Sequence, residues 1–302
     1  MDRDMKKLLI FGETIWDVYP DRAVIGGAPL NFAANLALLG DEAYLMTGIG
    51  TDELGDDAAR ILREYGIRDD FVLRVPDKTT GRCIVTLGEG GVPRYQVLTD
   101  TAYDHVHADD GVIAAIREAA FDVFYFNTLA QREPVSRASV RRILGEVSFR
   151  EIFCDINIRE GCWDRDSLAL CLSRATIVKI SEEEAHVIAE AGLIDGDLPF
   201  DEAVAAAFPN LRLMVYTMGK RGSAAYDFVR HTATFSGEPE QVKVVSTVGA
   251  GDCFGASFLH VLLAGGSVSE AIRFATARAN VVVAHTEAIP PVFAQEAKER
   301  AE

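Results

Sequence analysis

Residues 247–252, Thr-Val-Gly-Ala-Gly-Asp, could hold an anion next to a carboxylate. Residues 242–246 form an apolar run that predicts a strand, and residues 253–264 form a longer apolar segment that predicts a buried helix. Glycines let backbone N–H groups point into such a turn, and the N-terminus of a helix carries about half a positive charge. The segment therefore predicts a phosphate cradle between a strand and a helix.

Asp252 ends this segment, where its negative charge would repel a bound phosphate. One interpretation is that Asp252 takes a proton from an attacking hydroxyl group. The other is that Asp252 only complements the helix dipole, because aspartate is favoured in the first turn of a helix. This segment alone leaves both interpretations open.

Composition indicates an ordinary globular chain. Of its 302 residues 49% are hydrophobic and 25% are charged, which is enough for a large core in one or two domains. A net charge of −16 without a basic stripe argues against nucleic acid or an anionic membrane as partner. The five cysteines include no C-x-x-C pair, and we find neither a signal-peptide core nor an apolar run of transmembrane length. We therefore expect a cytoplasmic protein with reduced thiols.

The elements that would position these residues alternate along the chain. Short apolar runs predict strands at residues 8–11, 43–47, 123–126, 152–155, 176–180 and 213–217. Amphipathic segments predict helices at residues 30–39, 54–65 and 136–147. Apolar strands separated by helices are typical of an α/β fold with a mainly parallel sheet covered on both faces.

Residues 70–105 depart from this alternation. Segments 82–87 and 94–98 flank the turn Glu89-Gly90-Gly91 and predict a small antiparallel ribbon without a helix. No linker or repeat separates this ribbon from the rest of the chain. We therefore expect a single domain over residues 1–302, with a β lid formed mainly by residues of about 13–25 and 70–105.

Polar residues follow five of the predicted strands. Ligands of open parallel sheets bind at the carboxyl ends of the strands. The residues expected there are Asp17; Asp155, Asn157 and Arg159; Ser181 and Glu184; Thr217, Gly219 and Lys220; and Gly249 to Asp252. Each of these residue types is common in loops for local reasons, but their joint occurrence predicts a binding edge.

A second glycine-containing segment, residues 25–31, opens the first predicted helix with Ile-Gly-Gly-Ala-Pro-Leu-Asn. Gly27 permits close approach of a ligand to the backbone, and Asn31 offers both a donor and an acceptor to vicinal hydroxyls. The alternative is a simple tight turn with Asn31 facing solvent.

These motifs resemble a known family. Residues 26–40, followed by Gly50-Thr51-Asp52-Glu53-Leu54-Gly55, resemble the N-terminal signature of the ribokinase-like (PfkB) carbohydrate kinases, and residues 247–254 resemble their C-terminal signature. The intervening motifs follow the family's order, so the resemblance covers essentially the whole chain. It implies ATP-dependent phosphorylation of a sugar hydroxyl on a three-layer α/β/α sandwich. It also implies a β lid that often pairs two subunits into a homodimer.

The resemblance implies roles for residues at matching positions. Asp252 matches the catalytic base, and the backbone of Gly249, Ala250 and Gly251 matches the anion hole for the transferred phosphoryl group. The residues that match the sugar site are Asp17, Gly27 and Asn31. Those that match the nucleotide site are Thr217, Gly219 and Gly222 of a T-x-G-x-x-G loop, Gly249, Gly251, and Asn280 on a predicted helix over residues 268–285.

Two positions depart from the family pattern. Ser181 replaces the asparagine of the N-x-x-E motif, whereas Glu184 keeps its place. Because a water molecule can bridge the shorter side chain, we still expect dependence on Mg²⁺ positioned through Glu184. Ser246 replaces an aspartate that helps to hold a monovalent cation in many relatives, and Val248 offers no side-chain oxygen. We therefore expect little activation by potassium.

The choice of sugar depends on finer similarities. Residues 12–18, the Gly-Gly-Ala-Pro segment and Asp155-x-Asn157-x-Arg159 are most similar to the fructokinase branch, and 2-keto-3-deoxygluconate kinases share parts of this pattern. Asn157 and Arg159 are thus candidate substrate-binding residues. The Arg159 guanidinium would meet a carboxylate or the phosphoryl group. Alternatively, Arg159 is a surface residue paired with Glu160 or Asp155.

Two further classes of function remain open at this point. A nicotinamide-dependent oxidoreductase would use a similar sheet, but no G-x-G-x-x-G segment follows the first predicted strand. A non-catalytic sugar- or nucleotide-binding regulator would keep the fold without turnover, and the retained Gly-Ala-Gly-Asp segment argues against it.

Overall fold

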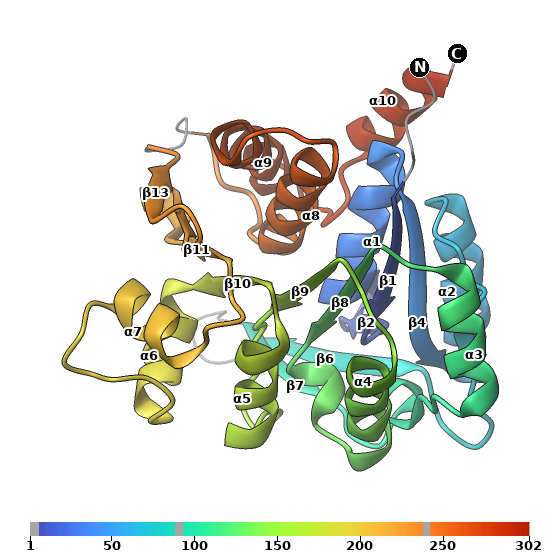
Figure 1. The fold of residues 1–302 in the computed structure, drawn as a ribbon. Coiled ribbons are helices and arrows are strands. Elements are labelled where there is room, and N and C mark those ends of the chain that lie inside the picture. Colours follow the sequence, from blue (N-terminus) through green and yellow to red (C-terminus); the bar gives the residue numbers. More distant parts are fainter. Residues whose placement is uncertain (1–5, 88–92, 238–241, 302) are drawn as a thin grey trace.

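The computed structural model of the chain describes residues 6–87, 93–237 and 242–301. Within these residues, nine strands form one large sheet in the order β13-β12-β11-β10-β9-β8-β1-β4-β5 (Figure 1). The pairs from β5 to β11 are parallel, and β12 and β13 extend the sheet as antiparallel strands. The bounds are β1 (Lys7–Phe11), β4 (Glu42–Ile49), β5 (Val72–Arg74), β8 (Val123–Asn127), β9 (Glu151–Asp155), β10 (Ile177–Ser181), β11 (Leu213–Thr217), β12 (Ser223–Asp227) and β13 (Thr232–Phe235).

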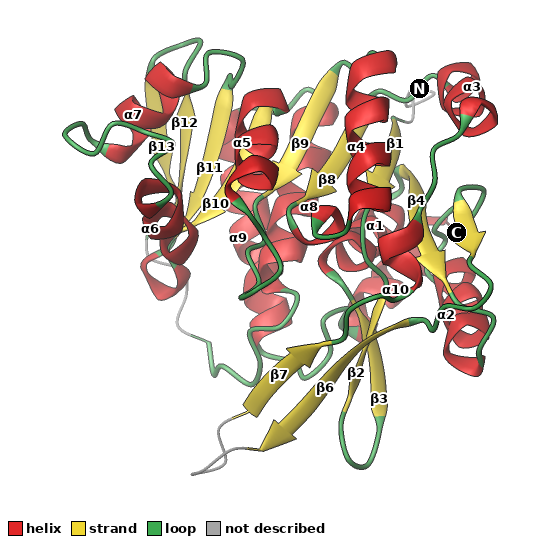
Figure 2. Cartoon of the chain, turned by 90° about the horizontal axis from the view of Figure 1, so that it is seen from below, coloured by secondary structure: helices red, strands yellow, loops and turns green. Residues whose placement is uncertain are grey.

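Helices cover both faces of the large sheet, as its apolar strands require. One face carries α1 (Ala28–Leu39), α8 (Ala250–Leu263), α9 (Val268–Val283) and α10 (Pro291–Ala301), and the other carries α3 (Asp110–Ala119), α4 (Pro134–Glu146), α5 (Arg165–Arg174), α6 (Glu182–Glu190) and α7 (Phe200–Ala207) (Figures 1 and 2). Strand β8 shows how alternate side chains serve the two cores. Tyr125 packs with Phe32 and Phe153 on the α1 side, whereas Phe124 and Phe126 pack on the α4 side. The predicted α/β/α sandwich is thus confirmed.

A smaller sheet projects from this body, in the order β3-β2-β6-β7 (Figure 2). Its strands are β2 (Ile15–Val18), β3 (Ala23–Gly26), β6 (Gly81–Leu87) and β7 (Pro93–Val97). The β2–β3 and β6–β7 pairs are antiparallel, and β2 pairs with β6 in parallel. Helix α2 (Glu53–Glu64) lies beside this sheet, where Trp16 of β2 packs against its buried Ala58 and Ala59.

The sequence interpretation of residues 70–105 was wrong at both ends. Strand β5 adds to the large sheet rather than to the small one, because it pairs with β4. Ala102–His105 form a 3₁₀ helix, η2, closed by a capping box between Thr101 and Asp104. The predicted turn Glu89-Gly90-Gly91 lies outside the described residues.

The expected strand over residues 242–246 was also wrong. These residues form no strand, and the backbone N–H groups of Val245 and Ser246 donate to the carbonyl of Val283 at the end of α9. The last carbonyls of a helix have no intrahelical partner, so they can accept these donors. The β12–β13 hairpin already forms this side of the sheet, and Val244 remains exposed.

In the part of the chain that the structure covers, no helix combines the length and the apolar composition that crossing a bilayer requires.

Candidate active site

Helix α8 begins at the predicted phosphate cradle. Gly249 is its N-cap residue and has a φ of +78°, and a Cβ atom there would lie 2.5 Å from the Cβ of Ala288. Glycine is therefore required both by the backbone conformation and by the close packing. No side chain caps this helix, and the Ala250 N–H donates to the Thr247 carbonyl at 3.3 Å, so in the described structure the N–H groups of Gly249 and Gly251 remain available to an anion.

Asp252 lies in the first turn of α8, half-buried, and faces α1. Its Oδ2 accepts a hydrogen bond of 2.8 Å from Nδ2 of Asn31. Burial raises the pKa of the Asp252 carboxyl above its ordinary value, although the Asn31 hydrogen bond and the charges of Lys179 and Arg159 act in the opposite direction. The contact joins two side chains that are 221 positions apart in sequence and that were both predicted as site residues.

Asn31 is buried, so the alternative in which it faces solvent was wrong. Its Nδ2 is engaged by Asp252, and its buried Oδ1 has no hydrogen-bond partner among the described residues. A buried unpartnered carbonyl oxygen is unfavourable unless a ligand or water satisfies it. Gly27, which precedes α1, has a φ of +110° and packs against the Glu13 carbonyl, which would lie 2.5 Å from an added Cβ.

A buried ion pair lies beneath the start of α8. Lys179 on β10 donates from Nζ to both carboxylate oxygens of Asp155 at the end of β9, each at 2.9 Å. Glycines at positions 251 and 255 make room for this lysine, because an added Cβ would lie 3.3 Å from its Nζ and 3.4 Å from its Cδ, respectively. The Lys179 charge also opposes the rise that burial causes in the pKa of Asp252 and Glu184.

Sequence analysis placed Asp155 at the binding edge but missed Lys179. The available signal was a lysine within the apolar strand Ile-Val-Lys-Ile-Ser, because lysine is almost never buried unless it is paired.

Glu184 and Ser181 form a capping box at the start of α6. The Ser181 hydroxyl accepts from the Glu184 N–H, and Glu184 Oε2 accepts from the Ser181 N–H at 2.7 Å. Its other oxygen accepts from the backbone N–H of Ile158 at 3.0 Å. Burial raises the pKa of this carboxyl. Each oxygen keeps a further lone pair that could bind a metal-coordinated water.

These residues fit the magnesium prediction only if the ion is held through water rather than by direct contact with a cluster of side chains. Among the described residues, no group of three or more His, Cys, Asp or Glu side chains could hold a metal ion. Mg²⁺ at nucleotide sites usually keeps several waters and is held by substrate phosphates with one or two carboxylates. Glu184, at the edge where α8 begins, can supply one such contact.

Asn157 follows β9 and is buried, with a left-handed φ of +46°. Its Nδ2 donates to Oε1 of Glu13 at 3.3 Å, and Glu13 Oε2 accepts from Nδ2 of Asn127 at 2.8 Å. Burial raises the pKa of Glu13 to about 7, against the opposing effects of the Asn127 hydrogen bond and the Arg159 charge. Sequence analysis missed Glu13 and Asn127 as site residues. Their signal was a polar residue at the end of, or shortly after, an almost wholly buried strand.

Asp17 and Arg159 approach the site from its outer side. Asp17 lies on β2 of the small sheet, in register with Cys83 of β6. Burial raises the pKa of Asp17, and the Arg159 charge opposes this shift. Arg159 is exposed, and in the described structure it forms an ion pair with neither Glu160 nor Asp155. Of the alternative, the surface position is therefore confirmed, whereas the pairing with Glu160 or Asp155 was wrong.

The predicted nucleotide residues occupy the neighbouring part of the same edge. Thr217 ends β11, beside Ser181 of β10. Gly219 and Gly222 have φ values of +54° and +89°, and the Gly222 carbonyl accepts from the Met218 N–H at 2.9 Å to close the loop. Asn280 is half-buried on α9, which packs against α8. No hydrogen bond between Asn280 and the other site residues occurs in the described structure.

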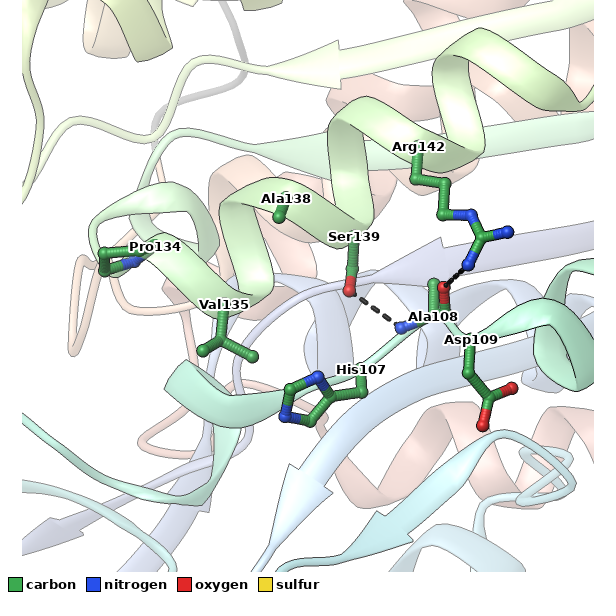
Figure 3. A pocket seen from close by; sticks show the side chains of 8 residues that line it. All are labelled: His107, Ala108, Asp109, Pro134, Val135, Ala138, Ser139 and Arg142. Atoms are coloured by element: carbon green, nitrogen blue, oxygen red, sulfur yellow. Dashed lines mark hydrogen bonds between the residues drawn. The ribbon is translucent and has the colours of Figure 1, made fainter.

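A surface groove of about 430 Å³ lies between α4 and the segment after η2 (Figure 3). It is lined by His107 to Asp109 and by residues of α4, including Pro134 and Arg142. It contains none of the predicted site residues, so the site described above follows from the residues at the sheet edge and not from the groove.

Comparison with known proteins agrees with this arrangement. The profile of the pfkB family carbohydrate kinases matches residues 1–294. Fructokinase-1 of Oryza sativa subsp. japonica is 28% identical, over 93% of this chain and 92% of its own length, and probable fructokinase-2 of Arabidopsis thaliana is 27% identical, over 95% and 93%. The structure of a fructokinase with bound ATP from Xylella fastidiosa has a similar fold, with a TM-score of 0.82 at 19% identity over 98% of this chain and 99% of that chain. The chain therefore belongs to the pfkB family of carbohydrate kinases and is an ATP-dependent sugar kinase.

Proposed function

We propose that the protein is a fructokinase, which transfers the γ-phosphoryl group of ATP to a hydroxyl of fructose. The observation that carries the reaction is the Asn31–Asp252 contact at the uncapped N-terminus of α8, which puts a carboxylate next to an anion cradle. Fructose as the acceptor is supported by the names of relatives that match almost the full chain at 28% and 27% identity.

In this mechanism Asp252 accepts the proton of the attacking sugar hydroxyl. Asn31 holds one carboxylate oxygen of Asp252 through its Nδ2 and offers its free Oδ1 to a sugar hydroxyl. The raised pKa of Asp252 makes it a better proton acceptor than an exposed aspartate, while Lys179 and Arg159 favour its ionised form. Asp17, Gly27, Asn157 and Arg159 complete the sugar site in this proposal.

The start of α8 supplies the stabilisation that phosphoryl transfer requires. The backbone N–H groups of Gly249, Ala250 and Gly251 are proposed to bind the oxygens of the transferred group, because positioning and charge stabilisation provide most of the acceleration. Thr217, Gly219, Gly222 and Asn280 are proposed to hold the nucleotide. Mg²⁺, when bound, neutralises phosphate charge, and Glu184 would hold it through water.

The small sheet is proposed to act as a lid that excludes water from the reaction, within a single kinase domain. It is also the proposed contact of a homodimer, and its exposed Val24 and Tyr95 support this assignment. Light scattering of the purified protein measures the oligomeric state. We also propose a cytoplasmic location, since all five cysteines are buried and unpaired.

A screen of ADP release tests the proposed function. The panel contains fructose, ribose, 2-keto-3-deoxygluconate, tagatose phosphate and nucleosides, each with ATP and Mg²⁺. We expect the highest kcat/KM with fructose. ADP release with none of these acceptors would overturn the proposal, and a higher kcat/KM with another sugar would overturn fructose as the acceptor.

A second candidate acceptor is 2-keto-3-deoxygluconate, because Arg159 is an exposed guanidinium without a carboxylate partner in the described structure. A carboxylate on the substrate would supply this partner. In that case Arg159→Lys would raise KM for the acidic sugar much more than KM for fructose, because lysine cannot reproduce the bidentate geometry.

A further inference from the structure

Glu13 is a buried carboxylate to which the proposed reaction assigns no role. It lies two residues after β1 and is 1% exposed. Its Oε1 accepts from the backbone N–H of Ala28 at 3.2 Å and from Nδ2 of Asn157 at 3.3 Å, and its Oε2 accepts from Nδ2 of Asn127 at 2.8 Å. Donors from the start of α1, the end of β8 and the segment after β9 thus converge on one carboxylate.

The orientations of two of these donors are fixed independently of Glu13. Rotation of the Asn127 amide would break a hydrogen bond, because its Oδ1 accepts from the backbone N–H of Ala130 at 3.0 Å. The Ala28 N–H belongs to the first residue of α1, a helix that has no side-chain cap from its own N-cap residue. Glu13 therefore serves as a remote cap of the helix that carries Asn31.

Asn157 is the third donor, and its backbone has a left-handed φ of +46°, a conformation that is uncommon outside glycine although asparagine adopts it more readily than most residues. Surrounding contacts help to hold such a conformation. The contacts present are the side-chain hydrogen bond to Glu13 and a bond of 3.3 Å from the Thr128 hydroxyl to the Asn157 carbonyl.

We propose that Glu13 is a positioning residue for the sugar, which holds Asn157 and the start of α1 at fixed places and so sets the geometry of the acceptor. Glu13 makes no direct contact with the reacting atoms in this proposal. The inference rests on the proposed function, because Asn31 and Asn157 are sugar-binding residues only there.

An exchange of hydrogen-bonding roles between Glu13 and Asn127 provides the test. In Glu13→Gln, an amide donor meets the fixed Asn127 donor, and in Asn127→Asp, two carboxylates face each other. In the double variant, the glutamine donates to one aspartate oxygen, and the other aspartate oxygen still accepts from Ala130. The three hydrogen bonds of the side chain at position 13 and the one from the Ala130 N–H can then all form again, with donor and acceptor exchanged only between positions 13 and 127.

At pH 8 we expect KM for the sugar to rise about tenfold in each single variant, because a buried donor or acceptor loses its partner, while KM for ATP stays nearly unchanged. The double variant should recover most of the loss. Glu151→Gln is the matched control. Glu151 is also buried and hydrogen-bonded, to Thr176 and Arg212, but it begins β9 at the opposite end of the sheet. Its substitution should lower stability without changing KM for the sugar.

Glu13→Asp provides a second variant if Glu13→Gln does not fold. It keeps the charge but is shorter by one methylene group, so it should also raise KM for the sugar selectively. An unchanged sugar KM in the single variants, or a double variant no better than the poorer single variant, would overturn the inference. A wild-type chain that phosphorylates no sugar would instead overturn the proposed function.

Discussion

At the ends of β1, β8 and β9 the polar side chains are buried and bonded to one another, whereas the loop after β11 and the segment before α8 are exposed. Glu13, Asn127 and Asn157 are each at most 7% exposed and form one hydrogen-bonded cluster. On the other side, Val244 is 62% and Val248 45% exposed. The proposed sugar side is therefore built before any ligand arrives, whereas the proposed nucleotide side leaves apolar surface for a ligand to cover.

Breaking the buried Lys179–Asp155 pair at the end of β9 tests the buried side of this comparison and should be costly. Lys179→Met leaves a buried unpaired carboxylate and should lower the free energy of unfolding by about 3–5 kcal/mol. Urea unfolding measures this change. Adding Asp155→Leu removes the stranded charge and should recover most of the loss, since an apolar pair often replaces a buried ion pair without penalty.

Arg212→Met is the control for that variant. It breaks the ion pair with Glu151, but the arginine side chain is 46% exposed and Glu151 keeps the hydrogen bond from the Thr176 hydroxyl, so a smaller loss is expected. Equal losses in the two variants would mean that burial does not set the cost of breaking an ion pair in this protein.

The pH dependence of stability sharpens the comparison at Glu13. Burial raises its pKa from 4.5 to about 7, against the effects of the Asn127 and Ala28 hydrogen bonds and the Arg159 charge; Tyr103 and Tyr125 are the other titratable groups that interact with it. Between these pH values the folded chain binds a proton that the unfolded chain has released. The Glu13 contribution to stability is therefore fully present below pH 4.5 and is lost as the pH rises through 7, a change of about 3 kcal/mol.

Unfolding free energies of the wild type and Glu13→Gln at several pH values between 5 and 8 measure this contribution. Because glutamine does not titrate, the wild type should lose stability relative to the variant as the pH rises, and the difference should level off above pH 7. A constant difference over this range would contradict the assignment.

Much of the fold could be predicted from local sequence, but the buried cluster could not. Strand β11 was predicted with the observed bounds. The glycines before α8 indicated an anion cradle because the turn that they form depends only on neighbouring residues. The Glu13–Asn127 contact joins residues 114 positions apart, so at the sequence level each side chain looked like an ordinary loop residue. The strand predicted at residues 242–246 was wrong although its composition suits a strand. The N–H groups of Val245 and Ser246 donate to the end of α9 instead of to a neighbouring strand.

The nucleotide side should respond to changes of the loop backbone. Gly222→Ala forces a φ of +89° on alanine and would place its Cβ 2.1 Å from the Gly237 carbonyl oxygen, so KM for ATP should rise about tenfold with KM for the sugar unchanged. Initial rates at varied ATP and sugar concentrations separate the two constants.

Gly219→Ala is its matched control. Gly219 also has a positive φ, of +54°, but nothing lies within 4 Å of an added Cβ, so the rise should be no more than about threefold. A larger effect of Gly219→Ala would show that the packing against Gly237 is not important for the nucleotide.

The smallest expected effect concerns monovalent cations. Ser246 has no carboxylate that could bind a cation, and its hydroxyl accepts a hydrogen bond from the Val248 N–H at 3.2 Å. Replacing sodium by potassium at constant ionic strength should therefore leave kcat nearly unchanged. A severalfold increase would contradict this prediction.

The most direct test of the whole account is the turnover of Asp252→Asn. Asparagine keeps the size of the side chain but cannot accept the hydroxyl proton, so kcat should fall by about 10²–10⁴-fold. Binding of ATP, measured by calorimetry, should persist because the N–H groups at the start of α8 are unchanged. A variant with near-normal kcat would show that the carboxylate beside Asn31 is not the base.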